Sequence, residues 1–330
     1  MNDDKNIFAI IGAGAIGSRH LQGLCKLNSQ STIYVIDPSK ESLTQAEQRA
    51  SEVQFQKDLI NLNFSTDMSP LPKRLSVAIL ATSSQARLQA MCSLLKKSKP
   101  DALVLEKIAF PCRESFAQAD KEIHRNGIRT WVNCPRRMNP AYEFIRENIK
   151  CSGPLTMNVK GANYGLACNA IHFIDLFAFI SENSSYSIGT ERLLPEIFQS
   201  KRRGYSEIFG ELNLKFENSG NLSISCEKTE DNKPQFVVDL SGEGFKIQID
   251  EINNRISVER DDRTLFSDLS YTTLFQSELT KVLAEELIDM KTCRLATFEE
   301  SMALHLPFLD AVSEFYTKLT GNPASSLLIT

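Results

Sequence analysis

Short apolar runs alternate with helical patterns through the first 132 residues. The run Asn6–Ile11 is almost continuously apolar, as expected for a strand that helices cover on both faces. Further strands are predicted at 31–36, 76–81, 102–105 and 128–132, and helices at 15–27, from Pro38 onward, at 84–97 and at 113–126. This alternation of strand and helix predicts an α/β fold with a doubly wound parallel sheet.

After residue 133 the pattern changes, because extended segments follow one another with few helices between them. These segments are 155–160, 208–216, 221–226, 235–240, 245–249 and 255–259, and helices are predicted near 141–149, 170–180, 271–290 and 298–319. Turn residues such as Ser241-Gly-Glu-Gly244 separate the strands. We therefore expect an α+β second half with a largely antiparallel open sheet.

Composition places the chain among ordinary globular proteins. It has 330 residues, of which 42% are hydrophobic and 24% charged, a length that suits two domains. The net charge of -4 argues against nucleic acid or an anionic membrane as a partner. The first six residues are polar and acidic, unlike a signal peptide, and no apolar stretch reaches about 18 residues, so we expect a cytoplasmic protein.

The cysteine and histidine patterns indicate no metal site. Eight cysteines form no Cys-x-x-Cys pair, and the four histidines lie far apart in the sequence. Without an export signal a reducing compartment is the better expectation. We interpret most of these thiols as small buried hydrophobic groups.

A glycine-rich turn follows the first strand. Gly12 permits the tight turn, Gly14 lets the backbone approach a pyrophosphate, and Gly17 lets the helix pack close to the strand. The helix that begins with Ala15 and Ile16 presents unpaired N–H groups to the phosphates. This pattern predicts a dinucleotide-binding Rossmann domain over residues 1–132, with residues 133–330 as the substrate and oligomerisation domain.

Asp37 lies twenty residues beyond Gly17, at the end of the second predicted strand. A carboxylate in this place accepts hydrogen bonds from the ribose hydroxyls and repels a 2′-phosphate, so it favours NAD over NADP. The alternative is that Asp37 only caps the helix that Pro38 opens. Lys40 nearby leaves room for NADP.

Two later strands end in residues suited to the same ligand. Thr82 and Ser83 follow the strand at 76–81, and Glu106 and Lys107 follow the strand at 102–105. Ligands of doubly wound sheets bind beyond the carboxyl ends of the strands, so we expect these residues at the cofactor. Lys107 should point toward the nicotinamide, although a solvated lysine at a strand end remains the alternative.

The sequence resembles the Gfo/Idh/MocA family of oxidoreductases (glucose-fructose oxidoreductase and inositol dehydrogenase). The resemblance covers nearly the whole chain and rests on residues 12–20, Ala81-Thr82-Ser83, Glu106-Lys107, Asn133 with Arg136, Arg137 and Pro140, His172-Phe-Ile-Asp175 and Thr297-Phe-Glu-Glu-Ser301. It implies an enzyme that moves a hydride between NAD(H) and a carbinol or carbonyl carbon of a sugar, a sugar derivative or a cyclic polyol. A non-catalytic dinucleotide sensor on the same fold is the alternative function.

The resemblance also implies the catalytic residues. Lys107 matches the family's active-site lysine and His172 its histidine in the second domain, so we expect His172 as general base and Lys107 as hydrogen-bond donor, or the reverse. The chain departs from the family at two places. Ile108 replaces the proline after the lysine, and Cys168 replaces an aspartate four residues before the histidine. Asn169 or Asp175 could replace the missing carboxylate.

Substrate contacts are expected from the second domain. Arg136 and Arg137 would bind an anionic group by paired hydrogen bonds, or else form surface ion pairs. Tyr164 lies at the edge of a predicted polar pocket, and Asn169 and Asp175 complete the candidate substrate residues. The antiparallel sheet could supply a broad contact face, so we expect a homo-oligomer, a dimer or a tetramer.

Overall fold

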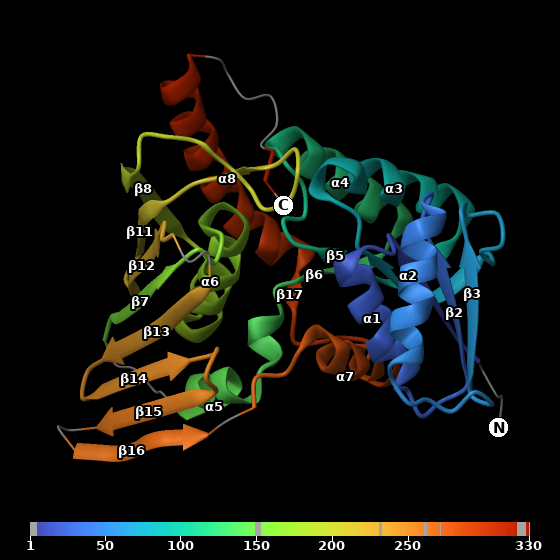
Figure 1. Ribbon diagram of the computed structural model, residues 1–330, viewed down its shortest axis with the longest axis horizontal. Coiled ribbons are helices and arrows are strands. Elements are labelled where there is room, and N and C mark those ends of the chain that lie inside the picture. The colour runs from blue at the N-terminus through green and yellow to red at the C-terminus, as the bar shows by residue number, and fades with distance from the viewer. Residues whose placement is uncertain are drawn as a thin grey trace. The chain divides into compact units, whose positions relative to one another are not determined.

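The structure is a computed structural model that describes residues 5–148, 153–230, 233–260, 263–270, 272–321 and 328–329 (Figure 1). The chain divides into two compact units. The first contains Met1–Phe110, Glu114–Pro135 and Leu274–Phe298, and the second contains Pro111–Arg113, Arg136–Thr273 and Glu299–Thr330. The C-terminal part of the chain therefore contributes to both units, which the pattern of strands and helices did not indicate.

A seven-stranded sheet forms the centre of the first unit. Its strands are β1 (Asn6–Ile11), β2 (Ser31–Ile36), β3 (Ile60–Ser65), β4 (Arg74–Leu80), β5 (Lys99–Glu106), β6 (Arg129–Asn133) and β17 (Ala296–Thr297). The order is β17-β6-β5-β4-β1-β2-β3, and only β17 runs antiparallel to its neighbour. This confirms the predicted doubly wound parallel sheet. The pattern missed β3, because this edge strand alternates apolar residues with asparagine and is mostly half-buried.

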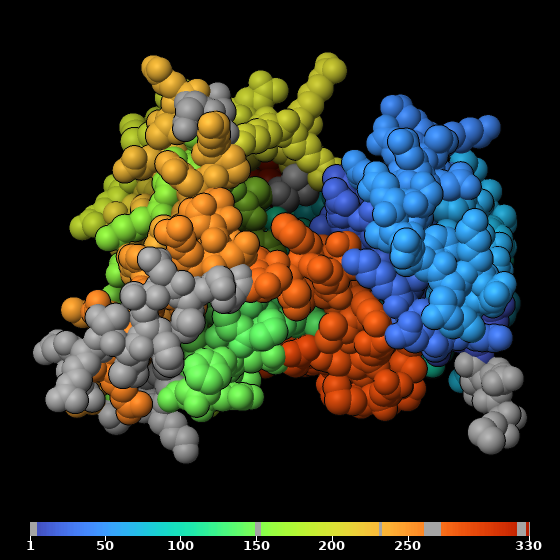
Figure 2. Space-filling model, turned by 60° about the horizontal axis from the view of Figure 1, so that its bottom comes forward, coloured from blue at the N-terminus to red at the C-terminus, as the bar shows by residue number. Residues whose placement is uncertain are grey.

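Helices cover both faces of this sheet. They are α1 (Ala15–Cys25), α2 (Lys40–Ser51), α3 (Ser84–Lys97), α4 (Arg113–Asn126) and α7 (Gln276–Asp289). In Figure 1, α1, α2 and α7 lie on one side of the strands and α3 and α4 on the other. Figure 2 shows the orange-red α7 segment packed against the blue N-terminal segment. At Gly23 a Cβ atom would lie 2.6 Å from the Thr280 Cβ, so α1 and α7 approach closely because this position is glycine.

An eight-stranded sheet forms the second unit. Its strands are β7 (Leu155–Ala162), β8 (Tyr186–Leu193), β11 (Gly210–Phe216), β12 (Gly220–Glu227), β13 (Gln235–Gly242), β14 (Phe245–Asp250), β15 (Arg255–Arg260) and β16 (Arg263–Ser270). The order is β16-β15-β14-β13-β7-β12-β11-β8, with β7 and β12 as the parallel pair. A separate two-stranded ladder pairs β9 (Phe198–Gln199) with β10 (Ser206–Glu207). The predicted, largely antiparallel open sheet is confirmed.

One face of the second sheet is apolar and the other polar. The helices of this unit are α5 (Pro140–Asn148), α6 (Leu166–Ser181) and α8 (Phe298–Thr320), with a short 3₁₀ turn at Pro135–Met138. Along β12, Leu222, Ile224 and Cys226 are buried, whereas Asn221 and Ser223 between them are more exposed. Nearly every residue of α6 is buried, and the helix packs on β7 and β12. The core of the second unit therefore lies between α6 and one face of the sheet.

Candidate cofactor and substrate sites

The glycine-rich turn in the first unit leaves space at the start of α1. Gly12 has φ of +102°, and a Cβ there would lie 2.8 Å from the backbone of Ala81 and Thr82. A Cβ at Gly17 would lie 1.9 Å from the Gly12 carbonyl oxygen, so only glycine lets α1 pack this closely on β1. A Cβ at Gly14, by contrast, would have no atom within 4 Å.

The N-terminus of α1 is suited to bind an anion. The N-cap residue Gly14 has no side chain to cap this helix, and the first turn, which begins with the exposed Ala15 and the half-buried Ile16, contains no acidic residue. The first N–H groups of a helix have no intrahelical acceptor, and the helix dipole adds partial positive charge there. Together with the space at Gly14, this arrangement fits the pyrophosphate of a dinucleotide.

Asp37 connects the turn to the second strand. Its Oδ2 accepts a hydrogen bond from the Ala13 N–H at 2.7 Å, and its Oδ1 accepts one from the Ser39 N–H at 2.9 Å. The cap of α2 is Ser39, whose hydroxyl accepts from the Ser42 N–H at 3.1 Å. Asp37 therefore holds the glycine-rich turn and the start of α2 together. Each carboxylate oxygen has a second lone pair that a ribose hydroxyl can use.

A buried arginine links the ends of β4 and β5. Arg87 is 1% exposed, and its Nη1 donates to the carbonyl of Ile108 and, at 2.8 Å, to that of Ala109. Its Nη2 donates to the carbonyl of Thr82. Sequence reasoning attached no function to Arg87, because nothing in the sequence shows which carbonyl groups lie around it. In the structure it fixes the two strand ends expected at the cofactor.

Thr82 fits a ligand at the end of β4. Its backbone carbonyl is held by Arg87, but its hydroxyl is buried and has no hydrogen-bond partner among the described residues. A buried hydroxyl without a partner costs free energy, which a ligand group in hydrogen-bond range would remove. Ser83 next to it is the N-cap residue of α3, and its side chain makes no capping hydrogen bond.

Glu106 at the end of β5 lies in a buried polar network. It is 5% exposed, and its Oε1 contacts the His20 Nε2 at 2.9 Å and accepts from the Asn133 Nδ2 at 2.5 Å. Burial raises the pKa of Glu106, but hydrogen bonds from His20 and Asn133, with the charges of His20 and Arg87, lower it further and the net direction is downward. Lys107, the next residue, is half-buried, and its peptide bond to Ile108 is cis.

His172 lies in the second unit, two turns into α6. Its side chain is 8% exposed and is surrounded by the apolar residues of that helix. Cys168 lies one turn earlier on the same helix, and its thiol contacts the carbonyl of Gly165 at 3.5 Å. Gly165 is the N-cap residue of α6 and has φ of +85°.

Glu207 supplies a carboxylate at this helix end that the sequence did not reveal. It is 6% exposed, and its Oε1 accepts from the N–H groups of Ala167 and Ile208. A Cβ at Gly165 would lie 3.0 Å from the Glu207 Oε2 and 2.9 Å from the Cys168 Sγ, so both atoms border the same point. No spacing signal could have found this residue, because it is forty residues from the helix that it caps.

Both predicted anion-binding arginines form ion pairs within the second unit. Arg136 binds Glu251 through two hydrogen bonds, Nε to Oε1 at 2.9 Å and Nη2 to Oε2 at 3.0 Å, and its guanidinium lies 4.4 Å from the centre of the Phe173 ring. Arg137 donates from Nε to the Asp175 Oδ2 at 2.7 Å. The structure thus pairs Arg137 with Asp175 and Arg136 with Glu251, and Arg136 is still near enough for its charge to lower the pKa of Asp175.

Tyr164 and Asn169 lie close together before and within the first turns of α6. The Asn169 amide donates to the carbonyl of Tyr164, and the Tyr164 hydroxyl donates to the carbonyl of Ser225 at 2.8 Å. Tyr164 is 8% exposed, and burial, with the nearby Cys226 and Glu207, raises the pKa of its phenol. Asn169 is half-buried and is thus more accessible than Tyr164 or Asp175.

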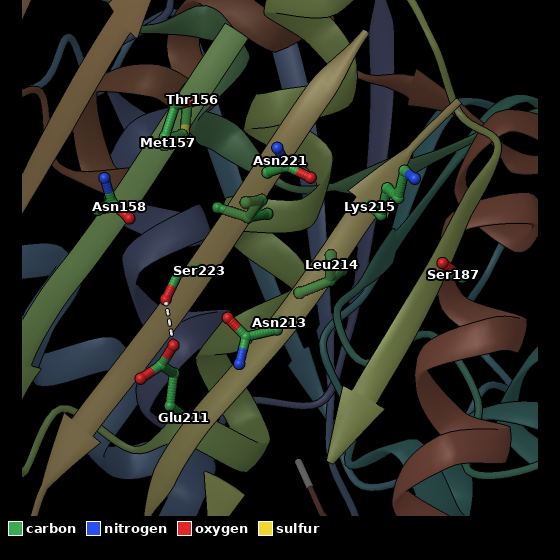
Figure 3. Close-up of a pocket in the computed structure, with 11 residues that line it drawn as sticks. Thr156, Met157, Asn158, Ser187, Glu211, Asn213, Leu214, Lys215, Asn221 and Ser223 are labelled. Carbon is green, nitrogen blue, oxygen red and sulfur yellow. Dashed lines mark hydrogen bonds between the residues drawn. The ribbon is translucent and has the colours of Figure 1, made fainter. Parts of the chain in front are cut away.

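A shallow hollow of about 360 Å³ lies on the polar face of the second sheet (Figure 3). It is lined by Thr156, Met157, Asn158, Ser187, Glu211, Asn213, Leu214, Lys215, Asn221, Leu222 and Ser223. The Ser223 hydroxyl donates to Glu211 across it at 3.0 Å. None of the predicted site residues lines this hollow.

Within the described parts of the chain, no group of three or more His, Cys, Asp and Glu side chains is arranged to hold a metal ion. No described helix is long and apolar enough to cross a membrane. The cysteines in these segments form no disulfide bond, and Cys25, Cys134 and Cys226 are buried. Cys151 lies outside the described residues.

Comparison with known proteins shows the fold. No protein-family model matches the chain. An oxidoreductase from Agrobacterium radiobacter, solved with NAD+, L-tartaric acid and magnesium, superposes with a TM-score of 0.71 at 12% identity over 96% of this chain and 97% of the other. The scyllo-inositol dehydrogenase of Lactobacillus casei, solved with NAD(H) and scyllo-inositol, gives a TM-score of 0.67 at 13% identity over 96% and 98%. The chain shares its fold with these two oxidoreductases.

A curated relative matches part of the sequence. The 4-carboxy-2-hydroxymuconate-6-semialdehyde dehydrogenase of Sphingobium sp. is 26% identical over 196 residues, which are 52% of this chain and 58% of the relative. The matched segment thus spans little more than half of either protein. The expected resemblance to Gfo/Idh/MocA-type dehydrogenases is confirmed at the level of the fold.

Proposed function

We propose that this chain is a nicotinamide-dependent oxidoreductase that moves a hydride between NAD(H) and a carbinol or carbonyl carbon of a sugar, a sugar derivative or a cyclic polyol. The uncapped N-terminus of α1 carries the proposal, since Gly14 leaves space in front of it and Asp37 is bound to the same turn. The NAD(H) and scyllo-inositol bound to the Lactobacillus casei enzyme support this class of reaction.

The cofactor residues of the proposal all lie in the first unit. Gly12, Gly14, Ala15, Ile16 and Gly17 would hold the pyrophosphate by their backbone. Asp37 would accept the ribose hydroxyls and favour NAD over NADP, because a 2′-phosphate beside a carboxylate is repelled.

The nicotinamide half would be bound by the ends of β4 and β5, through Thr82, Ser83, Glu106 and Lys107. Thr82 would use the hydroxyl that lacks a partner among the described residues, and Glu106 would act through the network that orients the backbone before Lys107. We keep the assignment of cofactor binding to residues 1–132 and of substrate binding to residues 133–330.

The chain must also move a proton. Oxidation of an alcohol removes a hydride from carbon and a proton from oxygen, and bound NAD supplies the hydride acceptor. We assign the proton to His172 as general base, with Lys107 as hydrogen-bond donor to the reacting oxygen, or with the two roles exchanged. Of the substrate residues, Asn169 and Arg136 are half-buried and would contact the ligand directly. Arg137, Tyr164 and Asp175 are buried and would border the same site.

The test follows the absorbance of reduced nicotinamide. Purified protein is mixed with NAD+ or NADH and a panel of cyclic polyols, sugars, nucleotide sugars and one carboxylated semialdehyde, the last because the Sphingobium relative is named for such a substrate. We expect turnover that is lost in Lys107→Met and kept in Lys96→Met, an exposed lysine on α3. Full activity of Lys107→Met would refute the proposal. Tight NADH binding without turnover on any substrate would favour the sensor instead.

We also propose that the chain forms a homo-oligomer through the polar face of the second sheet. Glu211 and Lys215 lie on one strand, β11, so a second copy related by a two-fold axis can pair each with the other. Sedimentation velocity should show a dimer or tetramer that Lys215→Glu weakens. A monomer at micromolar concentration would refute this.

A further inference from the structure

Four buried polar side chains and one half-buried one, Gln276, meet inside the first unit at the ends of β5 and β6. They come from four segments far apart in sequence: His20 on α1, Glu106 at the end of β5, Asn133 at the end of β6, and Gln276 with Thr280 on α7. His20 is 0% exposed and Glu106 is 5% exposed. Most buried polar groups are hydrogen-bonded, so the donors and acceptors around His20 can be counted.

Thr280 determines which hydrogen His20 carries on one side of its ring. The Thr280 hydroxyl donates to the carbonyl of Gln276 at 2.7 Å and accepts from the Gln276 Nε2 at 3.0 Å. A hydroxyl has one hydrogen, so toward the His20 Nδ1 at 2.9 Å it can only accept. The Nδ1 atom therefore carries a hydrogen and donates it to Thr280.

Glu106 determines the other side of the ring. Its Oε1 already accepts from Asn133 and lies 2.9 Å from the His20 Nε2. Two acceptor atoms do not approach to this distance without a proton between them. Because Nδ1 is already protonated, a neutral ring would offer only a lone pair at Nε2, and the pair must therefore hold one more proton.

Charge favours the histidine as the place of that proton. Arg87 is a second positive group whose charge acts on Glu106, and it fixes the neighbouring Ile108 and Ala109 carbonyls. With the Asn133 amide it stabilises the carboxylate form of Glu106. A carboxylate buried at this depth needs a paired cation, and His20 is the group in contact with it.

We propose that His20 is an imidazolium and a positioning residue, which neutralises Glu106 and thereby fixes the strand end from which Lys107 projects. The proposal rests on the function assigned to Lys107 above. Glu106 is the last residue of β5 and Lys107 is next, so any shift of Glu106 moves the Lys107 backbone.

The protonation state can be measured without any substrate. Protein labelled with ¹⁵N-histidine gives ring-nitrogen shifts that separate imidazolium from either neutral tautomer, and His20→Gln identifies the His20 signals. At neutral pH we expect both His20 nitrogens to be protonated. In Glu106→Gln, which keeps the shape but removes the charge, we expect a neutral ring protonated at Nδ1 alone. A wild-type ring protonated only at Nε2, with the Thr280 hydroxyl donating to it, would overturn the proposal.

The positioning role needs a readout that loss of structure alone would not change. We propose labelling of lysines with a small acylating reagent, followed by mass spectrometry, with and without NADH. In folded His20→Gln we expect the Lys107 labelling rate to change by about fivefold, as when one hydrogen bond is lost, while Lys96 is unaffected. NADH should still bind, since Gly12–Gly17 and Asp37 are intact.

Two results would separate this inference from the proposed function. An unchanged Lys107 labelling rate in folded His20→Gln would overturn the positioning role, whatever the enzyme does. If Lys107→Met leaves turnover intact, the proposed function fails, but the ring-nitrogen measurement still decides the state of His20. His124→Gln, an exposed histidine on α4, is the matched control and should leave both readouts as in the wild type.

Discussion

The two units place their polar chemistry differently. In the first, nearly every residue of the central strands is buried, and polar groups collect where the strands end: Asp37, Thr82, Glu106 and Asn133. In the second, polar side chains line one face of β7, β11 and β12, and the charged groups near α6 form the pairs Arg136–Glu251 and Arg137–Asp175. A parallel sheet covered on both faces thus restricts a polar ligand to one edge, whereas the open sheet does not.

The largest effect is expected where the first unit is packed most closely. In Gly17→Ala the new Cβ would lie 1.9 Å from the Gly12 carbonyl oxygen. Because this oxygen belongs to the backbone, α1 itself must move. We expect a loss of about 4 kcal/mol or more in the free energy of unfolding, or no folded protein. Gly14→Ala is the matched change, since a Cβ there meets nothing within 4 Å.

Gly14→Ala should therefore keep the melting temperature of the wild type and lose NADH affinity, because the methyl group occupies the space in front of the α1 N–H groups. Thermal unfolding and NADH fluorescence titration on the same samples separate the two effects. Equal melting temperatures for both alanine variants, or normal NADH binding by Gly14→Ala, would contradict this account of the turn.

The second unit should be most sensitive at its buried ion pair. Arg137→Met leaves the Asp175 carboxylate, 1% exposed, without its partner, and removing one member of a buried pair costs about 3–5 kcal/mol. Arg137→Met/Asp175→Leu should recover most of this loss, since replacing both members of such a pair is often neutral. Urea unfolding of both variants measures the difference, and equal losses would refute it.

The stability of Arg137→Met should depend on pH in a defined direction. Burial raises the pKa of Asp175, and Arg137, which lowers it, would be absent. A carboxyl whose folded-state pKa lies above its unfolded value binds its proton more tightly when folded. The penalty in Arg137→Met is therefore full above that pKa, and the stability lost relative to wild type should shrink as the pH is lowered through it. A penalty independent of pH would exclude Asp175 as its cause.

The sequence predicts the local features of both units, but it does not predict contacts between residues far apart in the chain. Helices 84–97 and 113–126 and the parallel sheet follow from local periodicity, and α3 and α4 have the predicted bounds. The glycine-rich turn is local too, within six residues. His20 with Glu106, and Glu207 with Ala167, are separated by 86 and 40 residues, so only the fold brings them together. Arg136 and Arg137 were expected to bind an anionic group or to form surface ion pairs, but the sequence did not show that Glu251 and Asp175 are their partners.

A smaller effect is expected for cofactor preference. Asp37→Asn keeps one oxygen for the Ala13 or Ser39 N–H but removes the negative charge beside the turn. We expect the ratio of NADH to NADPH affinity to fall by about tenfold, which corresponds to about 1.4 kcal/mol. Parallel fluorescence titrations with the two cofactors give the ratio. An unchanged ratio would mean that Asp37 acts only on the turn and the start of α2.

The smallest effect tests whether Glu207 acts by charge or by hydrogen bonding. Glu207→Gln keeps an oxygen that accepts from the Ala167 and Ile208 N–H groups, but it removes the negative charge from the N-terminus of α6. A charge there contributes about 0.3–1 kcal/mol, and up to about 2 kcal/mol when partly buried, so we expect a loss in that range. Glu207→Ala should cost more, because it leaves both buried N–H groups without an acceptor. Urea unfolding of both variants distinguishes the two causes, and equal losses for both would show that the hydrogen bonds contribute nothing beyond the charge.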